Sequence, residues 1–246
     1  MCGIIGYAGK QPALPVILDG LKRLEYRGYD SAGVAILEPD RTLSLGKGEG
    51  KLESLIASVN HQGSGTVGIG HTRWATHGRA NRENAHPHID CSGNLAVVHN
   101  GIVENHRELK KELASAGHRF LSQTDSEVIP HLIERYLAQG ASLEEAVRLA
   151  VVLLAGAHVI AVVSRQEPEK VVGVRMGHAG GLSVGYGKGA IFLASDLPAM
   201  LPHVGEVIYL SHGEMAAITH SQALFTNLDG KALPKDRQPV VQDPEN

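Results

Sequence analysis

The chain has 246 residues, of which 43% are hydrophobic, and its 23 basic and 26 acidic residues give a formal net charge of −3. This balance excludes a whole-protein field that would recruit nucleic acid or an anionic membrane surface. The sequence also lacks a signal peptide and an apolar run of the roughly 20 residues that span a bilayer, so we expect a globular, cytoplasmic protein.

Apolar segments predict strands along most of the chain, because they alternate with polar residues or run continuously. The segments are 2–8, 31–38, 66–74, 94–100, 158–164, 170–176, 190–195 and 206–210. Apolar residues at helical spacing predict a helix from Leu14 to Leu24 and three adjacent helices over roughly 104–155. Strands on both sides of these three helices exclude the strict alternation of a doubly wound sheet and favour an α+β fold with antiparallel sheets.

Capping signals predict where two of the helices begin. "TDSE" at 124–127 and "SLEE" at 142–145 each place Ser or Thr three residues before Glu, and Gly140 is expected to close the first helix. "GKGEGK" at 46–51 and "GYGKGA" at 185–190 fit no phosphate-binding motif and are interpreted as turns at strand ends. Residues 231–246 form a linker-like tail after a domain of residues 1–230.

Cys2 is one of only two cysteines, and no CxxC pair offers a zinc site. Removal of Met1 would leave Cys2 with a thiol and a free α-amine, whose pKa of about 7.7–8.0 suits it to act as base for its own side chain. Cys2 is therefore a candidate nucleophile. The alternative is a small buried side chain in an N-terminal strand.

"HNGIVEN" at 99–105 follows an apolar run. Asn100 and Gly101 alone would suit a type I′ hairpin turn, but the helical sequence after them favours a position where a strand ends. A side-chain amide and a glycine N–H side by side could form an oxyanion hole.

"HTRWATHG" at 71–78 contains Arg73 and the only tryptophan, Trp74. The guanidinium could hold the α-carboxylate of an amino acid, with Asp125 as counter-charge for its ammonium group. The alternatives are a solvated arginine at a strand end and ordinary charge compensation at a helix N-terminus. "HPH" at 86–88 lacks ligands at metal spacing, so we expect no metal and no cofactor.

Several segments resemble the glutaminase domain of the glutamine–fructose-6-phosphate aminotransferases, a branch of the class II glutamine amidotransferases. In chain order they are "CGIIGY" at 2–7, "EYRGYDSAG" at 25–33, "HTRWATHG" at 71–78, "NAHPH" at 84–88, "HNGIVEN" at 99–105 and "TDSEV" at 124–128. The resemblance implies a four-layer αββα sandwich of two antiparallel sheets, the N-terminal nucleophile hydrolase fold. It also implies hydrolysis of L-glutamine to glutamate and ammonia through a thioester on Cys2.

The resemblance assigns roles to individual residues. Cys2 is the implied nucleophile after loss of Met1, Asn100 and Gly101 form the oxyanion hole, and Arg27 supports Cys2. The implied glutamine-binding residues are Arg73, Trp74, Thr76, His77, Gly101 and Asp125. A sugar-phosphate isomerase domain is the expected partner, in the same longer chain or as a separate subunit, because none is present here. Neither a nucleic acid nor a membrane is expected as a partner.

Two departures from the family pattern affect the expected glutamine pocket. "RMGHAGGLSVG" at 175–185 stands where the family has R-x-G-S-P-L-x-x-G, and "GAH" at 156–158 stands where GAY is usual. Loss of Ser-Pro adds conformational freedom, which should affect affinity more than chemistry. Two other functions stay open: another class II amidotransferase or N-terminal cysteine amidase, and a silent regulatory module that retains Met1.

Overall fold

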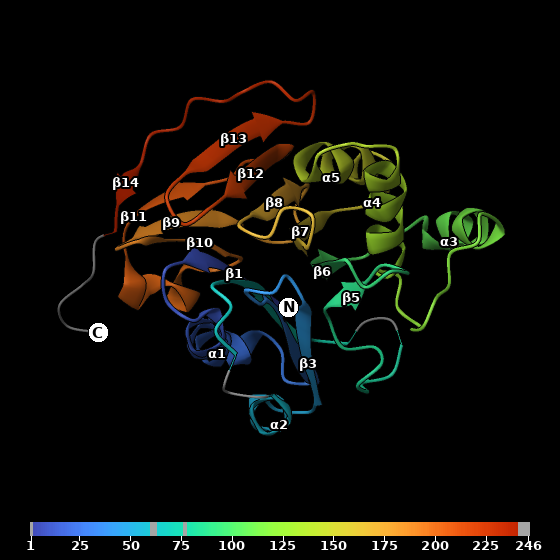
Figure 1. The fold of residues 1–246 in the computed structure, drawn as a ribbon, viewed down its shortest axis with the longest axis horizontal. Coiled ribbons are helices and arrows are strands. Elements are labelled where there is room, and N and C mark those ends of the chain that lie inside the picture. Colours follow the sequence, from blue (N-terminus) through green and yellow to red (C-terminus); the bar gives the residue numbers. More distant parts are fainter. Residues whose placement is uncertain (1, 60–62, 76–77, 241–246) are drawn as a thin grey trace.

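A computed structural model describes residues 2–59, 63–75 and 78–240, and within them the strands form two fully antiparallel sheets (Figure 1). The first sheet has the strand order β14-β11-β9-β10-β1-β4-β2-β3, and the second has the order β13-β12-β8-β7-β6-β5. The expected α+β fold with antiparallel sheets is confirmed.

The strands of the first sheet come from both ends of the chain. They are β1 (Gly3–Gly9), β2 (Ser31–Leu37), β3 (Leu43–Glu49), β4 (Val67–Arg73), β9 (Ser183–Gly187), β10 (Ala190–Ala194), β11 (Val204–Tyr209) and β14 (Gln238–Pro239). The second sheet is built from β5 (His88–Ile89), β6 (Leu95–Gly101), β7 (His158–Ser164), β8 (Val171–Met176), β12 (Glu214–Ile218) and β13 (Ala223–Asn227). The α-helices are α1 (Ala13–Leu24), α2 (Leu52–Ser58), α3 (His106–Ser115), α4 (Val128–Ala138) and α5 (Leu143–Val151). Short 3₁₀ turns lie at Glu25–Arg27, Leu197–Ala199 and Leu201–His203.

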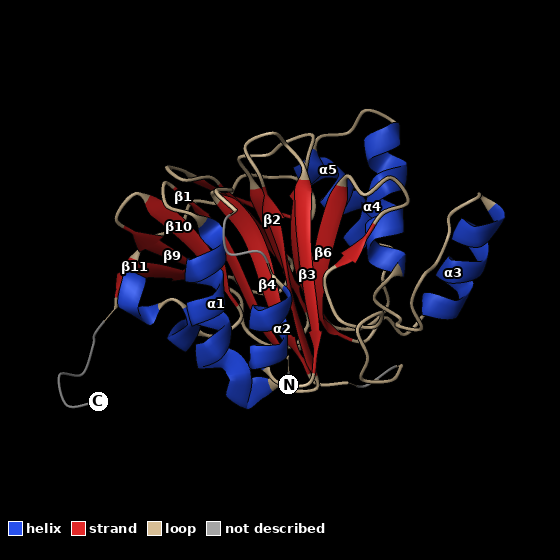
Figure 2. Cartoon of the chain, turned by 60° about the horizontal axis from the view of Figure 1, so that its bottom comes forward, coloured by secondary structure: helices blue, strands red, loops and turns tan. Residues whose placement is uncertain are grey.

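The two sheets stack face to face, and helices cover both outer faces (Figures 1 and 2). Alternate residues of β1 show this layering, since Ile4 joins the core between the sheets and Ile5 joins the core under α1. In β7, Val159 likewise faces the other sheet while Ile160 packs under the helices α4 and α5. Successive residues of these strands therefore pack into the cores on opposite faces of their sheet. The two sheets and the helices on their outer faces together form four layers.

The predicted helices form, with one correction at a helix start. Ser142 caps α5 by accepting a hydrogen bond from the Glu145 N–H (3.3 Å), as its motif predicts. The capping box expected at 124–127 is wrong, because α4 begins at Val128 without a side-chain cap. Glu127 instead accepts hydrogen bonds from the backbone N–H groups of Leu121 (2.6 Å) and Ser122 (2.7 Å). Hydrogen bonds within the preceding loop thus replace the expected capping box.

The two glycine-rich segments have different structures. Lys188 and Gly189 form the expected turn between β9 and β10. The turn expected at 46–51 is wrong, because β3 continues through this segment to Glu49. At Gly48 a Cβ atom would lie 2.4 Å from the backbone nitrogen of Leu55, so glycine allows α2 to pack directly on the strand.

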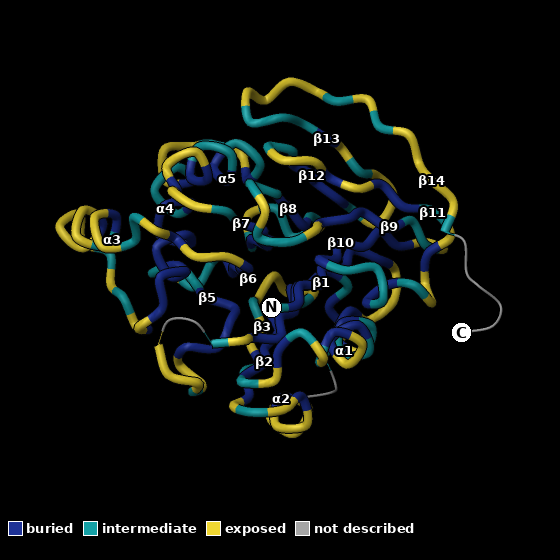
Figure 3. The backbone as a smooth tube through the Cα atoms, turned by 180° about the vertical axis from the view of Figure 1, so that it is seen from behind, coloured by how far each residue is buried: buried dark blue, intermediate teal, exposed yellow. Residues whose placement is uncertain are grey.

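Burial is uneven along the chain, as Figure 3 shows by colour. All seven residues of β7 are buried, whereas α3 buries only Leu109 and Leu113. The described part of the expected tail does not run free of the domain, since Gln238 of β14 pairs with Val207 of β11. A domain boundary at residue 230 remains a prediction. Among the described residues, the helices are too short or too polar to cross a membrane.

Candidate active site

Cys2 lies directly before β1, beside the segment that follows β4. The backbone N–H of Trp74 donates a hydrogen bond to the Cys2 Sγ over 3.2 Å, and the side chain is partly buried. Burial raises the pKa of the Cys2 thiol, and the Trp74 hydrogen bond and the positive charge of Arg73 offset only part of this effect. The thiol is therefore mainly protonated at neutral pH, and nucleophilic attack requires a neighbouring base.

The segment around Trp74 is held by the loop "EYRGYD". Asp30 accepts a hydrogen bond from the Ala75 N–H at its Oδ2 (2.8 Å) and donates its own N–H to the carbonyl of Arg73 (3.0 Å). A Cβ at Gly28 would lie 2.7 Å from the carbonyl carbon of Arg73, so only glycine allows this approach. The loop therefore fixes the backbone that donates to Cys2. Asp30 was not predicted as a site residue.

Asn100 brings a side-chain amide to Cys2 from the end of β6. Its Nδ2 donates to the carbonyl oxygen of Cys2 over 3.0 Å, and the residue is buried. His71 Nε2 lies 3.0 Å from Asn100 Oδ1 and 3.1 Å from the carbonyl oxygen of His99. Because both of these oxygens are acceptors, Nε2 carries the proton. His71 thus orients the NH₂ group of Asn100 toward Cys2.

His71 is fully buried in β4, and burial lowers its pKa to about 3, so the ring is neutral at physiological pH. A neutral ring with a proton on Nε2 is a fixed hydrogen-bond donor. Sequence reasoning missed this role, although His71 opens the "HTRWATHG" motif. Gly101, the last residue of β6, is exposed and has a φ of +137°, so the prediction that a strand ends at Asn100 and Gly101 is confirmed.

Arg73 and Asp125 are both buried, and Arg73 lies near Cys2. Arg73 ends β4 and donates from Nη1 to the carbonyl of Arg79 over 3.2 Å. Burial lowers the pKa of the Arg73 guanidinium, while the nearby Cys2 thiol and the Asp125 carboxylate act in the opposite direction. Asp125 accepts the backbone N–H of Val103 at Oδ2 (2.7 Å). Arg73 therefore lies within electrostatic reach of both the Asp125 carboxylate and Cys2.

Other predicted pocket residues have different surroundings. Trp74 is 45% exposed, and its ring forms a T-shaped contact with the Tyr29 ring at a centroid distance of 5.5 Å. Thr76 and His77 lie outside the described residues. Their expected place in the glutamine pocket stays a prediction.

The "NAHPH" motif holds the segment that contains Asp125. Asn84 Oδ1 accepts the backbone N–H of Gln123 (2.9 Å), and His88 Nε2 lies 2.8 Å from the Thr124 hydroxyl. From β6, His99 Nδ1 contacts the Ser126 hydroxyl over 2.8 Å. These three bonds position residues 123–126 around Asp125, so the motif has a positioning role that its sequence did not indicate.

Arg27 forms an ion pair with Asp196. Its Nε donates to Asp196 Oδ2 over 2.8 Å, and the Tyr26 hydroxyl donates to the same oxygen. The preceding residue, Ser195, accepts the backbone N–H of Ile4 at its hydroxyl (2.9 Å). Support of Cys2 by Arg27 would therefore be indirect, through the start of β1, and it stays a prediction.

The two segments that depart from the family pattern lie against each other. His158 occupies the place of the usual tyrosine, and its Nδ1 lies 3.1 Å from His99 Nε2. A Cβ at Gly177 would approach the Cβ of Ala157 to 2.8 Å. The backbone of Ala157 in turn lies close to Gly101, because its carbonyl oxygen would be 2.2 Å from a Cβ there. Both departures thus border the predicted oxyanion hole.

A separate group of side chains has the chemistry of metal ligands. Its members are Cys91, His118, His131 and Glu134, and one ligand atom of each lies within 4.8 Å of the others. Sequence reasoning missed the group because three separate segments contribute to it. His88 of "HPH" does not belong to this group and instead bonds to the Thr124 hydroxyl.

Comparison with known proteins gives consistent results. The sequence model of the glutamine amidotransferase domain matches residues 57–230. Glutamine–fructose-6-phosphate aminotransferase [isomerizing] of Symbiobacterium thermophilum is 52% identical over 234 residues, which cover 95% of this chain and 38% of that relative. The enzyme of the same name from Methanothermobacter thermautotrophicus is 49% identical over 238 residues, covering 96% of this chain and 40% of the relative. The chain thus spans only about two fifths of these relatives.

Solved structures support the fold. Glutamine phosphoribosylpyrophosphate amidotransferase from B. subtilis, complexed with ADP and GMP, matches with a TM-score of 0.78 and 26% identity, covering 92% of this chain and 49% of that chain. A glutamine aminotransferase class-II domain protein from Silicibacter pomeroyi matches with a TM-score of 0.64 and 18% identity, covering 92% of this chain and 98% of the other. The sandwich of two antiparallel sheets expected from the N-terminal nucleophile hydrolases is confirmed.

Proposed function

The chain belongs to the family of glutamine amidotransferase domains, and on this premise we propose that it hydrolyses the side-chain amide of L-glutamine with Cys2 as nucleophile. One observation carries the proposal: the side-chain amide of Asn100 lies beside the Cys2 thiol. Its Nδ2 donates a hydrogen bond to the backbone carbonyl of Cys2 over 3.0 Å. An amide nitrogen has two N–H groups, so it can donate to a second acceptor next to the sulfur.

The proposed reaction uses Cys2 both as nucleophile and, through its α-amine, as base. After removal of Met1, the free α-amine takes the proton of the thiol, and Sγ attacks the side-chain carbonyl carbon of glutamine. Asn100 Nδ2 and the Gly101 N–H hold the oxyanion that develops on the carbonyl oxygen. The C–N bond then breaks, the α-ammonium returns the proton to the leaving nitrogen as ammonia departs, and a γ-glutamyl thioester remains. Water hydrolyses this thioester to glutamate and regenerates the thiol.

We propose that Arg73 and Asp125 select glutamine by its two charged ends. Arg73 would hold the α-carboxylate and Asp125 the α-ammonium, with Trp74, Thr76 and His77 bordering the same pocket. The electrostatic interaction between the two buried groups supports this assignment. A site with paired polar groups discriminates strongly, because a ligand without the matching charge leaves those groups unpaired.

We further propose that the chain is the glutaminase part of a glutamine–fructose-6-phosphate aminotransferase that makes glucosamine 6-phosphate. The identity of 52% to the Symbiobacterium thermophilum enzyme supports this, together with the coverage of only 38% of that relative. A sugar-phosphate isomerase domain, in a longer chain or as a separate subunit, would supply the acceptor site. The proposal is tested by adding the isomerase domain of a relative and measuring glucosamine 6-phosphate from fructose 6-phosphate and glutamine.

Mass spectrometry of the purified N-terminus, combined with an assay for ammonia release, tests the glutaminase activity. We expect Met1 to be absent and ammonia to be released from glutamine in clear preference to asparagine and simple acyl amides. Retention of Met1 without ammonia release would instead indicate a silent regulatory module. Equal turnover of the other amides would indicate an amidase of different specificity.

A further inference from the structure

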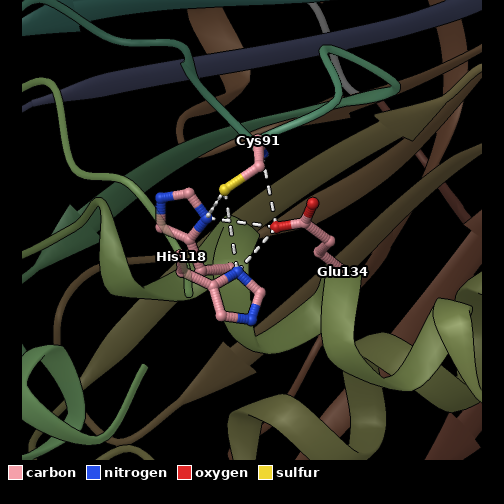
Figure 4. Close-up of side chains that lie close together, drawn as sticks. Cys91, His118 and Glu134 are labelled. Carbon is pink, nitrogen blue, oxygen red and sulfur yellow. Dashed lines mark hydrogen bonds and ion pairs between the residues drawn. The ribbon is translucent and has the colours of Figure 1, made fainter. Parts of the chain in front are cut away.

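Four side chains with metal-binding atoms converge in one cluster, and Figure 4 labels three of them. Cys91 lies in the turn between β5 and β6, and His118 follows the end of α3. His131 and Glu134 lie on α4 and are spaced i and i+3, so they share one face of the helix. The cluster therefore connects three segments that are separate in the sequence.

The spacing of the four ligand atoms fits one tetrahedral ion. Cys91 Sγ lies 3.8 Å from His118 Nδ1 and 3.6 Å from His131 Nδ1. Glu134 Oε2 lies 2.9 Å from His118 Nδ1 and 3.2 Å from His131 Nδ1. Zinc bond lengths of about 2.3 Å to sulfur and 2.0–2.1 Å to nitrogen or oxygen require edges of about 3.6 Å and 3.3 Å in a tetrahedron. These four separations lie close to the required values, and the remaining two pairs of ligand atoms lie within 4.8 Å.

The charges of the cluster also suit a divalent cation. Side-chain exposure is 1% for His131, 14% for His118 and 20% for Glu134, so an ion at the centre would be largely shielded from water. One thiolate and one carboxylate neutralise a 2+ ion, and two neutral imidazoles complete the ligand set. A buried charge is stable only when it is compensated in this way.

Backbone hydrogen bonds hold two of the four ligand atoms in place. The backbone N–H of Arg119 donates to Cys91 Sγ over 3.3 Å, and the backbone N–H of Cys91 donates to Glu134 Oε2 over 3.3 Å. Such contacts outside the ligand set orient metal ligands in proteins.

We propose that Cys91, His118, His131 and Glu134 bind one zinc ion in a closed, structural site. Sulfur and nitrogen donors in tetrahedral arrangement favour zinc over magnesium or calcium, which take oxygen ligands. Four protein ligands leave no open coordination position, so the ion would tie the β5–β6 turn and the end of α3 to α4. The site is independent of Cys2 and of the proposed glutamine hydrolysis.

Cobalt substitution in the full chain provides a direct test, because cobalt(II) reports geometry and sulfur ligation by its absorption. The titration is done in the Cys2→Ser variant, where Cys91 is the only thiol. We expect strong tetrahedral ligand-field bands and a sulfur-to-cobalt charge-transfer band at one ion per chain, both displaced by zinc. Weak octahedral bands, or absence of the charge-transfer band, overturn the proposal.

Zinc content and thermal stability test the ligand set. The chain, purified without a histidine tag, should contain one zinc per molecule, and its removal by a chelator should lower the melting temperature by roughly 5 °C or more. Glu134→Gln keeps the size of the side chain and should lower zinc affinity at least about 10-fold, even if Cys91→Ser fails to fold. His220→Ala changes an exposed histidine and serves as the control that retains zinc. Unchanged zinc affinity in both Glu134→Gln and a folded Cys91→Ser overturns the site.

Discussion

The two cysteines of this chain have different neighbours, and the difference separates two chemistries. Cys2 receives the backbone N–H of Trp74 and lies beside an oriented amide, with Arg73 as the nearby charge. Cys91 faces two imidazole nitrogens, and the Glu134 carboxylate completes the group. The first set consists of donors that can stabilise a substrate, whereas the second consists of atoms that can bind a cation.

The atoms that face each thiol determine which chemistry it can perform. Both thiols have pKa values raised by burial, so the direction of the shift does not distinguish them. Donors without ligand atoms leave a sulfur free to attack a carbonyl carbon. Convergent nitrogen and oxygen lone pairs instead predict that the sulfur is a ligand.

Substituting each cysteine in turn should give the largest changes in glutamine hydrolysis and zinc content. Cys2→Ala should lower glutamine hydrolysis at least about 10⁴-fold because the nucleophile is lost, while its zinc content stays unchanged. Cys91→Ala should lose zinc and keep turnover within a few-fold, provided that it is assayed below its melting temperature. Ammonia release and elemental analysis on the same samples measure both effects. Turnover by Cys2→Ala at the parental rate contradicts the mechanism.

Removing the oriented amide beside Cys2 should have the next largest effect. Asn100→Ala should lower kcat about 10²- to 10³-fold with a smaller change in KM, because the amide is expected to donate mainly in the transition state. His71→Ala should lower kcat by less, since it removes only the group that orients Asn100. Steady-state kinetics separate kcat from KM. An Asn100→Ala enzyme with a parental kcat rules out this oxyanion role.

Changing the predicted clamp should affect glutamine binding. Arg73→Ala should raise KM roughly 30-fold or more, because the α-carboxylate would lose its charged partner in a buried site. Arg73→Lys keeps the charge without the bidentate geometry and should recover part of the loss. A KM within two-fold of the parent in Arg73→Ala, with the fold intact by circular dichroism, removes Arg73 from the clamp.

The buried histidines around Asn100 and Asp125 predict a smaller, pH-dependent effect on stability. Burial lowers the pKa of His71 to about 3 and lowers those of His86, His88 and His99 as well. The unfolded chain, with ordinary values near 6.5, binds more protons below that pH, so the free energy of unfolding falls as the pH drops below about 6.5 and is fully retained above it.

The expected loss is up to about 1.4 kcal/mol per pH unit for each of these rings. Urea unfolding between pH 7 and 5.5, where carboxylates titrate little, measures it. His88→Gln should reduce the slope of the free energy of unfolding against pH by the equivalent of about one bound proton. His220→Gln, which changes an exposed histidine, should leave this slope unchanged. A flat stability profile over this range would contradict the neutral, buried state of the rings.

Much of the fold follows from the sequence because its strands are buried on both faces. Continuous apolar runs such as those of β6 and β7 are visible without any tertiary information. β3 was missed because its glycines and charged residues resemble a turn, and only the packing of α2 on Gly48 explains them. β14 was missed because two residues paired at a sheet edge carry too little local signal.

For the candidate site, sequence patterns identify groups but not their supports. Cys2, Asn100, Arg73 and Asp125 stand out by residue type or motif, and the structure brings them together. The positioning roles of Asp30 and His71 depend on hydrogen bonds between distant segments, which no spacing rule reveals. The Cys91 cluster was missed for the same reason, since its ligands are 3 to 43 positions apart.

Because few residues of α3 are buried, its backbone amides should exchange hydrogen early. Leu109 and Leu113 are the only buried residues of this helix, whereas every residue of β7 is buried. Amides of α3 should therefore exchange through local opening, long before those of β7, which require global unfolding. Since His118 lies just beyond α3, exchange recorded with and without zinc would show how far along the helix a single ion slows that opening.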